Sequence, residues 1–298
     1  LFAPLAEGAV STVYPALAEA PPDLFGIAVV GANGGVHLAG DAEHPFPIMS
    51  VAKPFVFALV REAIGGEAAR ERIGVDATGR PFNSLEAVER APDGRTNPMV
   101  NAGAIATVAL LPGADRAARW DTLRDGLSRF AGRALALDEP VLASASATNL
   151  VNRSLANLLA ARGALAGDPA DALDLYTRQS SLSVTARDLA TMGATLADGG
   201  VNPVTGERVV SAAACRDALA VMATAGLYET SGQWLYDVGM PGKSGIGGGI
   251  VTVAAVKGGL GTFAPRLDAA GNSVRGQRVA AFMARRLGLD PFGSEPLA

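Results

Sequence analysis

The chain has 298 residues, of which 49% are hydrophobic and 18% charged, the balance of a globular protein with a large core. A net charge of −4 leaves no basic stripe for nucleic acid. The longest apolar run, 102–112, is too short to cross a membrane and predicts a buried helix. We therefore expect neither nucleic acid nor a membrane as a partner.

Cysteine and histidine are scarce. Cys215 is the only cysteine, which excludes internal disulfides and favours a cytoplasmic location. The two histidines, His37 and His44, offer little material for a metal centre or a Ser-His-Asp triad. We expect no metal and no cofactor.

The first predicted elements form a β-hairpin. Residues 24–30 and 35–39 are rich in strand-forming side chains, and the glycines of 31–35 supply the turn between them. A short loop then leads to a predicted helix over 50–64. Because proline is tolerated only in the first helical turn, Pro54 places the start of this helix close to Ser50.

Helical patterns dominate the middle of the chain. A short helix is predicted over 67–73, and the Gly, Pro, Asn and Asp of 74–98 predict a loop that forms one wall of a cleft. Thr185 and Asp188 match a capping box. Further helices are predicted over 101–111, 116–131, 148–162, 169–177 and 185–198.

Strand character returns near the C-terminus. After a helix over 211–222, strands are predicted over 234–238, 249–255 and 259–264, followed by a helix over 274–287. Strands at both ends predict an α/β (α+β) fold with one central antiparallel sheet built from both termini. We expect a single domain over 1–298, with an α/β part from about 1–66 and 204–298 and a helical insertion over about 67–203.

Ser50 and Lys53 are the first candidate catalytic residues. Residues three apart in a helix share a face, so Lys53 Nζ can accept the proton of Ser50 Oγ. Such a lysine must be neutral, which requires burial or a cationic neighbour. Basic residues here are mostly arginine, which cannot be a base, and the lysines are Lys53, Lys243 and Lys257. The alternative is a helix-start serine beside a solvated lysine.

Lys243 and Ser244 lie in the glycine-rich stretch 239–250. A P-loop would require glycine where Asp237 stands, and a dinucleotide fingerprint fails at Ile250. Lys-Ser-Gly entering a strand is similar to the Lys-Thr-Gly element that accompanies Ser-x-x-Lys in penicillin-binding proteins and class A β-lactamases. Such a strand edge offers a backbone N–H to an oxyanion. The alternative is a glycine-rich hairpin without a ligand.

Other polar residues have structural as well as functional interpretations. Asn97 and Asn101 precede an apolar helix, where a turn residue and an N-cap are the structural alternatives. Tyr176 and Tyr228 are two of four tyrosines, and each is also compatible with a half-buried ring and a hydrated hydroxyl.

Long matches along nearly the whole chain resemble one family. They cover 23–30, 46–53, 80–84, 97–105, 173–176, 196–209, 241–250 and 271–274. Through them the chain resembles the serine-dependent glutaminases, whose fold is similar to that of β-lactamases and penicillin-binding proteins. The resemblance implies an amidohydrolase that converts L-glutamine, or a closely related carboxamide, to the acid and ammonia without a cofactor. We also expect a homo-oligomer, either a dimer or a tetramer.

The resemblance assigns roles to individual residues. Ser50 is expected to attack the amide, Lys53 to accept its proton, and Tyr228 to assist proton transfer to the leaving ammonia. Ile246 stands where the family usually has valine, whose backbone N–H forms the oxyanion hole with that of Ser50. The residues expected to contact the amino-acid substrate are Asn101, Asn152 and Tyr176, with Lys243 and Ser244 in support.

Three positions depart from the family pattern. Met49 stands where glutamine is usual, Ala145 where a glutamate follows Ser144, and Val13 where a tyrosine is usual, with Tyr14 one place away. A charge-assisted bond to an α-ammonium is worth about 1.5–3 kcal/mol. We therefore expect weak glutamine binding or an amide with a less polar head group.

Two other functions are compatible with the same residues. A β-lactam or peptide hydrolase would use the same serine and lysine. A catalytically idle ligand-binding relative would be compatible with Met49 and Ala145.

Overall fold

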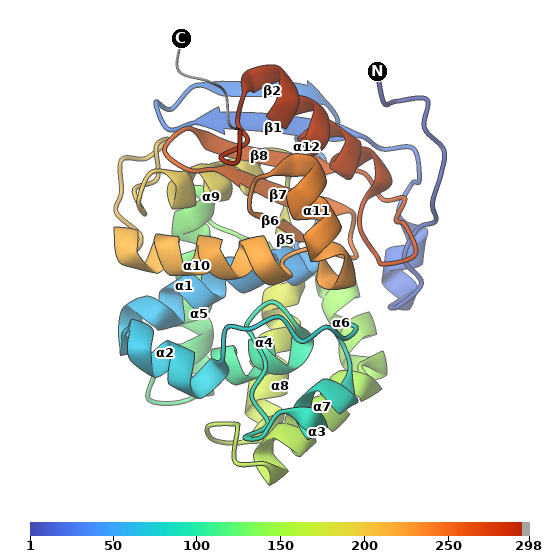
Figure 1. Ribbon diagram of the computed structural model, residues 1–298. Helices are drawn as coiled ribbons and strands as arrows, with labels where there is room; N and C mark the ends of the chain where they lie inside the picture. The colour runs from blue at the N-terminus through green and yellow to red at the C-terminus, as the bar shows by residue number, and fades with distance from the viewer. Residues whose placement is uncertain (294–298) are drawn as a thin grey trace.

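The computed structural model describes residues 1–293 and contains a five-stranded antiparallel sheet assembled from both ends of the chain (Figure 1). The strand order is β2-β1-β8-β7-β6. The strands are β1 (Gly26–Gly31), β2 (Val36–Gly40), β6 (Gly242–Ser244), β7 (Gly249–Ala254) and β8 (Gly258–Phe263). The predicted sheet is confirmed, as are the hairpin of β1 and β2 and the predicted strands at β7 and β8.

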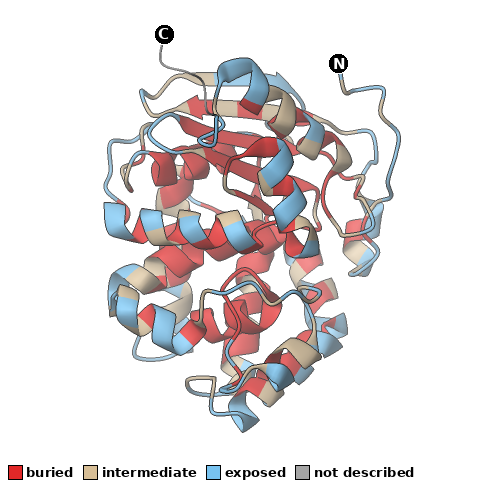
Figure 2. Ribbon diagram, viewed as in Figure 1, coloured by how far each residue is buried: buried red, intermediate tan, exposed pale blue. Residues whose placement is uncertain are grey.

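Helices cover both faces of this sheet. Helix α9 (Ala186–Ala197) packs on β1, β7 and β8, and α12 (Val274–Leu287) packs on β7 and β8 (Figure 1). Every residue of β8 is buried, whereas the outer strand β2 is largely exposed. Figure 2 shows the same gradient, with buried residues concentrated in the central strands.

Glycines allow α9 to lie against the sheet at backbone distance. A Cβ on Gly261 would collide with the carbonyl oxygen of Ala186, and one on Gly259 would collide with that of Ala190. The capping box predicted at the start of α9 is confirmed, since the Thr185 side chain and the Asp188 side chain each bond the other's backbone N–H.

The other half of the molecule is mainly helical. Its small sheet has the order β3-β5-β4, from β3 (Phe46–Pro47), β4 (Ala136–Leu137) and β5 (Leu182–Val184). Its helices are α1 (Lys53–Ile64), α2 (Gly66–Ile73), α3 (Leu85–Arg90), α4 (Asn101–Val108), α5 (Arg116–Ala131), α6 (Glu139–Thr148), α7 (Leu150–Ala161) and α8 (Pro169–Ser180). Figure 2 shows α4 and α8 buried at the centre of this half.

The predicted strand at 234–238 is wrong, because α11 (Ser231–Val238) occupies this range. Trp234 and Val238 are buried one helical turn apart, while Tyr236 between them is 90% exposed. Residues spaced i, i+4 fall on one face of a helix and also on one face of a strand, so this pattern fits both elements. The preceding helix is α10 (Ala212–Ala225), near its predicted place.

The predicted loop 74–98 contains one helix. Helix α3 begins after Ser84, whose hydroxyl oxygen accepts a hydrogen bond from the Ala87 N–H. Helix α6, which was not predicted, is capped in the same way by Asp138 and the Val141 N–H. Both are short helices that begin at a side-chain cap.

The proposed division into an α/β part and a helical insertion stays a prediction. Helix α9 lies within the range 67–203, yet it packs on the five-stranded sheet. Within residues 1–293, none of the helices combines the length and the apolar character needed to cross a membrane.

Replacing Gly261 by alanine tests the close contact between α9 and β8. We expect Gly261→Ala to lower the free energy of unfolding by about 1–3 kcal/mol or more, because the added methyl group forces backbone atoms apart. Urea denaturation of both proteins measures this difference.

Gly232→Ala is the matched control. Gly232 lies inside α11 with nothing near its missing side chain, so alanine there should stabilise the protein by about 0.5–1 kcal/mol. Equal effects of the two substitutions would contradict the packing argument.

Candidate active site

Ser50 and Lys53 lie together at the start of α1. Ser50 belongs to the 3-10 turn η2 (Met49–Ala52), and the Lys53 backbone N–H donates to the Ser50 carbonyl. Pro54 occupies the first turn of α1, which confirms the predicted helix start. Both residues are buried, with 8% of Ser50 and 1% of Lys53 exposed.

The turn before Ser50 is strained and packed against a glycine loop. Met49 has a φ of 48°, a value that non-glycine residues seldom adopt. A Cβ on Gly247 would lie 2.7 Å from the Pro47 carbonyl oxygen, and one on Gly245 would lie 3.1 Å from that of Ile48. These glycines therefore let the loop carrying Ile246 approach the turn of Ser50.

The Lys53 amine has neutral partners. Its Nζ donates to Asn101 Oδ1 at 2.7 Å and to the Met99 carbonyl oxygen at 3.3 Å. Among residues 1–293 no acidic side chain forms an ion pair with it, nor does a hydrogen bond join it to Ser50 Oγ. Burial lowers the pKa of Lys53 to about 7. The amine can thus be neutral near pH 7, as a base requires.

A chain of amides and phenols extends from Lys53. Asn101 Nδ2 donates to Asn152 Oδ1 at 2.8 Å, and Asn152 Nδ2 donates to Tyr14 Oη at 3.3 Å. Tyr176 Oη donates to Asn101 Oδ1 at 3.0 Å. The N-cap of α4 is Val100, so the N-cap alternative for Asn101 is wrong.

Asn97 is a turn residue, which was the structural interpretation of its position. Its side chain accepts a hydrogen bond from the Met99 N–H and donates to the Asp76 carbonyl, as expected of a turn residue. This fixes the backbone of Met99, whose carbonyl oxygen faces the Lys53 amine.

Tyr228 and Lys243 form a second group on the C-terminal side. Tyr228 Oη donates to the Ser244 carbonyl at 3.0 Å, and Lys243 Nζ donates to the same oxygen at 2.7 Å and to the Gly226 carbonyl at 2.9 Å. Lys243 Nζ also lies 4.3 Å from the centre of the Tyr228 ring. Tyr228 has a φ of 58°, the second strained position of the site.

Burial shifts the pKa of each titratable group here. It raises the pKa of Tyr228 and Tyr176 above the usual value. It lowers the pKa of Lys243 well below its usual range, and the nearby Lys53 lowers it further. Both tyrosines are therefore neutral proton carriers at ordinary pH.

The three positions that depart from the family pattern lie in different surroundings. Met49 is buried in an apolar cluster that includes Ile246, and Ala145 is also buried. Val13 is 56% exposed, and the phenol on Asn152 comes from Tyr14 instead. Whether Tyr14 takes the part expected of a tyrosine at position 13 stays a prediction.

Two contributors to this network were not predicted from the sequence. Tyr14 could have been predicted, because it lies one place from the position where the family usually has a tyrosine. The Met99 carbonyl could not, because the residue type does not mark a functional backbone oxygen. Within residues 1–293 no group of three or more His, Cys, Asp or Glu side chains gathers where a metal ion could be held. The arrangement brings together a buried hydroxyl, an amine whose pKa is lowered to about 7, and buried phenols.

Comparisons of the sequence and of the structure with known proteins all find the same family. The sequence model of the family described as Glutaminase matches residues 8–292. Glutaminase 2 of Yersinia pestis is 65% identical over 289 residues, which cover 97% of this chain and 85% of that protein. The solved structure of the probable glutaminase ybaS has a TM-score of 0.96 and 43% identity, covering 98% and 95% of the two chains.

A second solved structure, Mglu in its glutamate form, has a TM-score of 0.94 and 37% identity, covering all of this chain and 68% of Mglu. These neighbours share the β-lactamase-like fold, so the predicted fold class is confirmed.

Replacing Asn101 by aspartate tests the electrostatics of the Lys53 amine. A carboxylate at this position would stabilise the ammonium form, so Asn101→Asp should raise the pKa of Lys53 well above 7. Selective 13C labelling of lysine makes this measurable by NMR, because the chain has only three lysines.

Asn33→Asp, in an exposed turn, should leave the titration of Lys53 unchanged. A wild-type midpoint near the usual lysine value, or the same midpoint in wild type and Asn101→Asp, would contradict the assignment of a neutral amine.

Proposed function

We propose a mechanism from the premise that the chain belongs to the glutaminase family and is an amidohydrolase that acts on L-glutamine. In this mechanism Ser50 is the nucleophile and Lys53 is its base. The observation that carries the proposal is a buried lysine amine, without an acidic partner among residues 1–293, three residues from a buried serine.

The first half of the reaction forms an ester on Ser50. Lys53 Nζ removes the hydroxyl proton while Oγ attacks the side-chain carbonyl carbon of glutamine. The developing oxyanion is stabilised by the backbone N–H groups of Ser50 and Ile246. Tyr228 passes a proton to the departing nitrogen, the C–N bond breaks, and ammonia leaves. The proton that Lys53 took from Ser50 then moves to the Tyr228 oxygen, so that both groups regain their starting forms before water attacks.

The second half reverses these roles with water as the nucleophile. Water loses a proton to the same base and attacks the ester carbonyl, and the Ser50 oxygen recovers its proton as the C–O bond breaks. Glutamate is released and Lys53 returns to its neutral form. Lys243 and Ser244 support Tyr228, because the Lys243 amine and the Tyr228 hydroxyl share the Ser244 carbonyl.

The amide and phenol chain is proposed to hold the amino-acid end of the substrate. Asn101, Asn152 and Tyr176 offer donors and acceptors in a buried setting, and Tyr14 extends this set. The buried Ala145 supplies no charge for the α-ammonium group. We therefore propose that glutamine is bound more weakly than a carboxylate at this position would allow.

Location and assembly are further proposals. The single cysteine, which is buried and free, supports the predicted cytoplasmic location. The exposed apolar side chains of Leu150 and Val151 at the start of α7 support the predicted homo-oligomer, a dimer or a tetramer.

The pH dependence of turnover tests the Ser50 and Lys53 assignment. Since only neutral Lys53 accepts a proton, kcat/KM for ammonia release should rise with pH and level off above about 7. Ser50→Ala and Lys53→Arg should each lower kcat by roughly a thousandfold or more. A glutamine-derived electrophile should label wild-type Ser50, as seen by mass spectrometry, and fail to label Lys53→Arg.

Circular dichroism of each variant establishes that it is folded. Substantial turnover by folded Ser50→Ala, or a kcat/KM that falls as the pH rises through 7, would overturn the mechanism while leaving the family assignment intact.

Restoring a carboxylate at position 145 tests the affinity proposal. Ala145→Glu should lower the KM for glutamine by roughly tenfold, because it adds a charge-assisted bond to the α-ammonium group. Ala147→Glu, at an exposed position on the same helix α6, is the matched control. An unchanged KM in a folded Ala145→Glu protein would show that other groups already bind the ammonium.

A further inference from the structure

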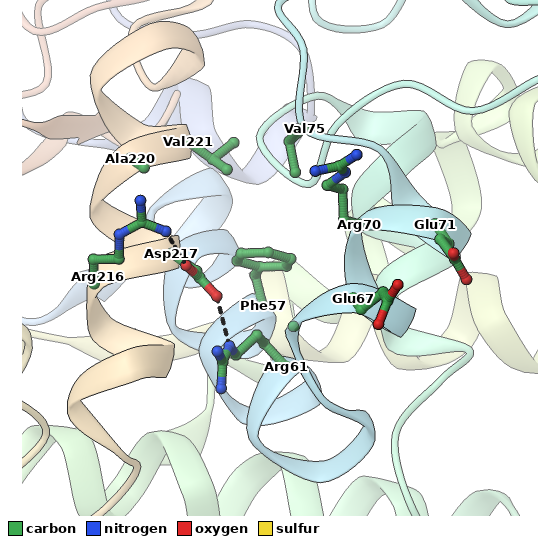
Figure 3. Close-up of a pocket in the computed structure, with 11 residues that line it drawn as sticks. Phe57, Arg61, Glu67, Arg70, Glu71, Val75, Arg216, Asp217, Ala220 and Val221 are labelled. Atoms are coloured by element: carbon green, nitrogen blue, oxygen red, sulfur yellow. Dashed lines mark hydrogen bonds and ion pairs between the residues drawn. The ribbon is translucent and has the colours of Figure 1, made fainter.

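A cavity lies away from Ser50, between helices α1, α2 and α10. Its volume is about 580 Å³, within the range of small-molecule sites. Phe57 of α1 and Val221 of α10 form apolar parts of its wall, together with Val75 after α2 (Figure 3). Charged side chains of α2 and α10 surround them.

Two glycines between α1 and α2 shape this cavity. Gly65 has a φ of 87°, which turns the chain sharply so that α2 follows α1 at once. A Cβ on Gly66 would lie 2.9 Å from Arg61 Nη2 and 3.1 Å from Asp217 Oδ2. Without a side chain there, the Arg61 and Asp217 pair remains at the cavity wall.

The charges on the α10 side pair with one another. Arg61 Nε lies 2.7 Å from Asp217 Oδ2, and Arg216 Nη1 lies 2.9 Å from Asp217 Oδ1 (Figure 3). This ion-pair chain joins α1 to α10. The Asp217 carboxylate pairs with the guanidinium groups of both Arg61 and Arg216, so all three groups already have partners.

The charges on the α2 side are different. Glu67 and Arg70 both line the cavity and are three residues apart, so they share a face of α2. Among residues 1–293, no ion pair includes either side chain. Figure 3 shows both on the opposite side of Phe57 from Asp217. Glu71 of the same helix also lines the cavity without an ion pair to the described residues, so the α2 side offers two carboxylates and one guanidinium beside apolar surface.

We propose that this cavity binds a free α-amino acid with an apolar side chain. Arg70 receives the ligand carboxylate, and Glu67 receives its ammonium group. The side chain of the ligand packs on Phe57, Val75 and Val221. A zwitterion fits better than a simple anion, because the charges lining the cavity are three basic and three acidic groups.

Because of where the cavity lies, we expect a ligand bound in it to affect turnover at the active site. Helix α1 begins at Lys53, and α10 ends at Ala225, shortly before Tyr228. A ligand held by α2 and packed on Phe57 and Val221 touches both helices. Because it restrains their relative movement, we expect it to change the rate of glutamine hydrolysis. Binding itself does not depend on the proposed mechanism.

L-leucine is the probe, and isothermal titration calorimetry is the measurement. Wild-type protein and Ser50→Ala should both bind leucine saturably, with a Kd of roughly millimolar order. Glu67→Gln and Arg70→Gln should each weaken binding by at least about fivefold. Arg72→Gln, an exposed neighbour on α2 outside this cavity, should bind as wild type does.

Two fragments of the probe separate the two charged contacts. 4-Methylpentanoate lacks the ammonium group and 3-methylbutylamine lacks the carboxylate, so each should bind more weakly than leucine. Saturating leucine should change kcat/KM for glutamine at least twofold in wild type and not in Arg70→Gln. Three results would overturn the proposal. The first is the absence of saturable binding, and the second is that Glu67→Gln and Arg70→Gln bind leucine as well as wild type does. The third is binding that has no effect on turnover.

Discussion

The buried amine of Lys53 is the constraint on which the rest of the site depends. Removing an ammonium group from water is costly, and a carboxylate partner would keep it charged by compensating that cost. Lys53 has an amide oxygen and a backbone carbonyl instead, which orient the amine without compensating a full positive charge. Burial lowers the pKa to about 7, and a residue that is ordinarily a cation can be neutral near pH 7.

This constraint explains why the site combines segments that are far apart in the chain. Burying Lys53 requires cover from α4 on one side and from the C-terminal strands on the other. The cover must approach at backbone distance, which the glycines at 245 and 247 permit. Two of the three positive-φ non-glycine residues among 1–293, Met49 and Tyr228, lie where these segments meet. Local backbone strain is thus concentrated at the candidate active site.

Local patterns predicted what depends on near neighbours in the chain. The hairpin, the capping box of α9, and the spacing of Ser50 and Lys53 are set by residues within a few positions of one another. The strand predicted at 234–238 was wrong because Trp234 and Val238 fit two periodicities, and only packing distinguishes them. The role of Tyr14 could not be derived locally, since its partner Asn152 is 138 residues away.

The polarity of the substrate pocket follows from the same electrostatics. A carboxylate near the amino-acid end of the substrate would strengthen binding of an α-ammonium group, but it would also favour the protonated form of any lysine within reach. Asparagine and tyrosine oxygens would accept hydrogen bonds from the ammonium without this effect. Met49 and Ala145 are both buried, and neither adds a charge to the site. Under the proposed mechanism, weaker substrate affinity and a more readily deprotonated base would be two consequences of one arrangement, and they would act in opposite directions on kcat/KM.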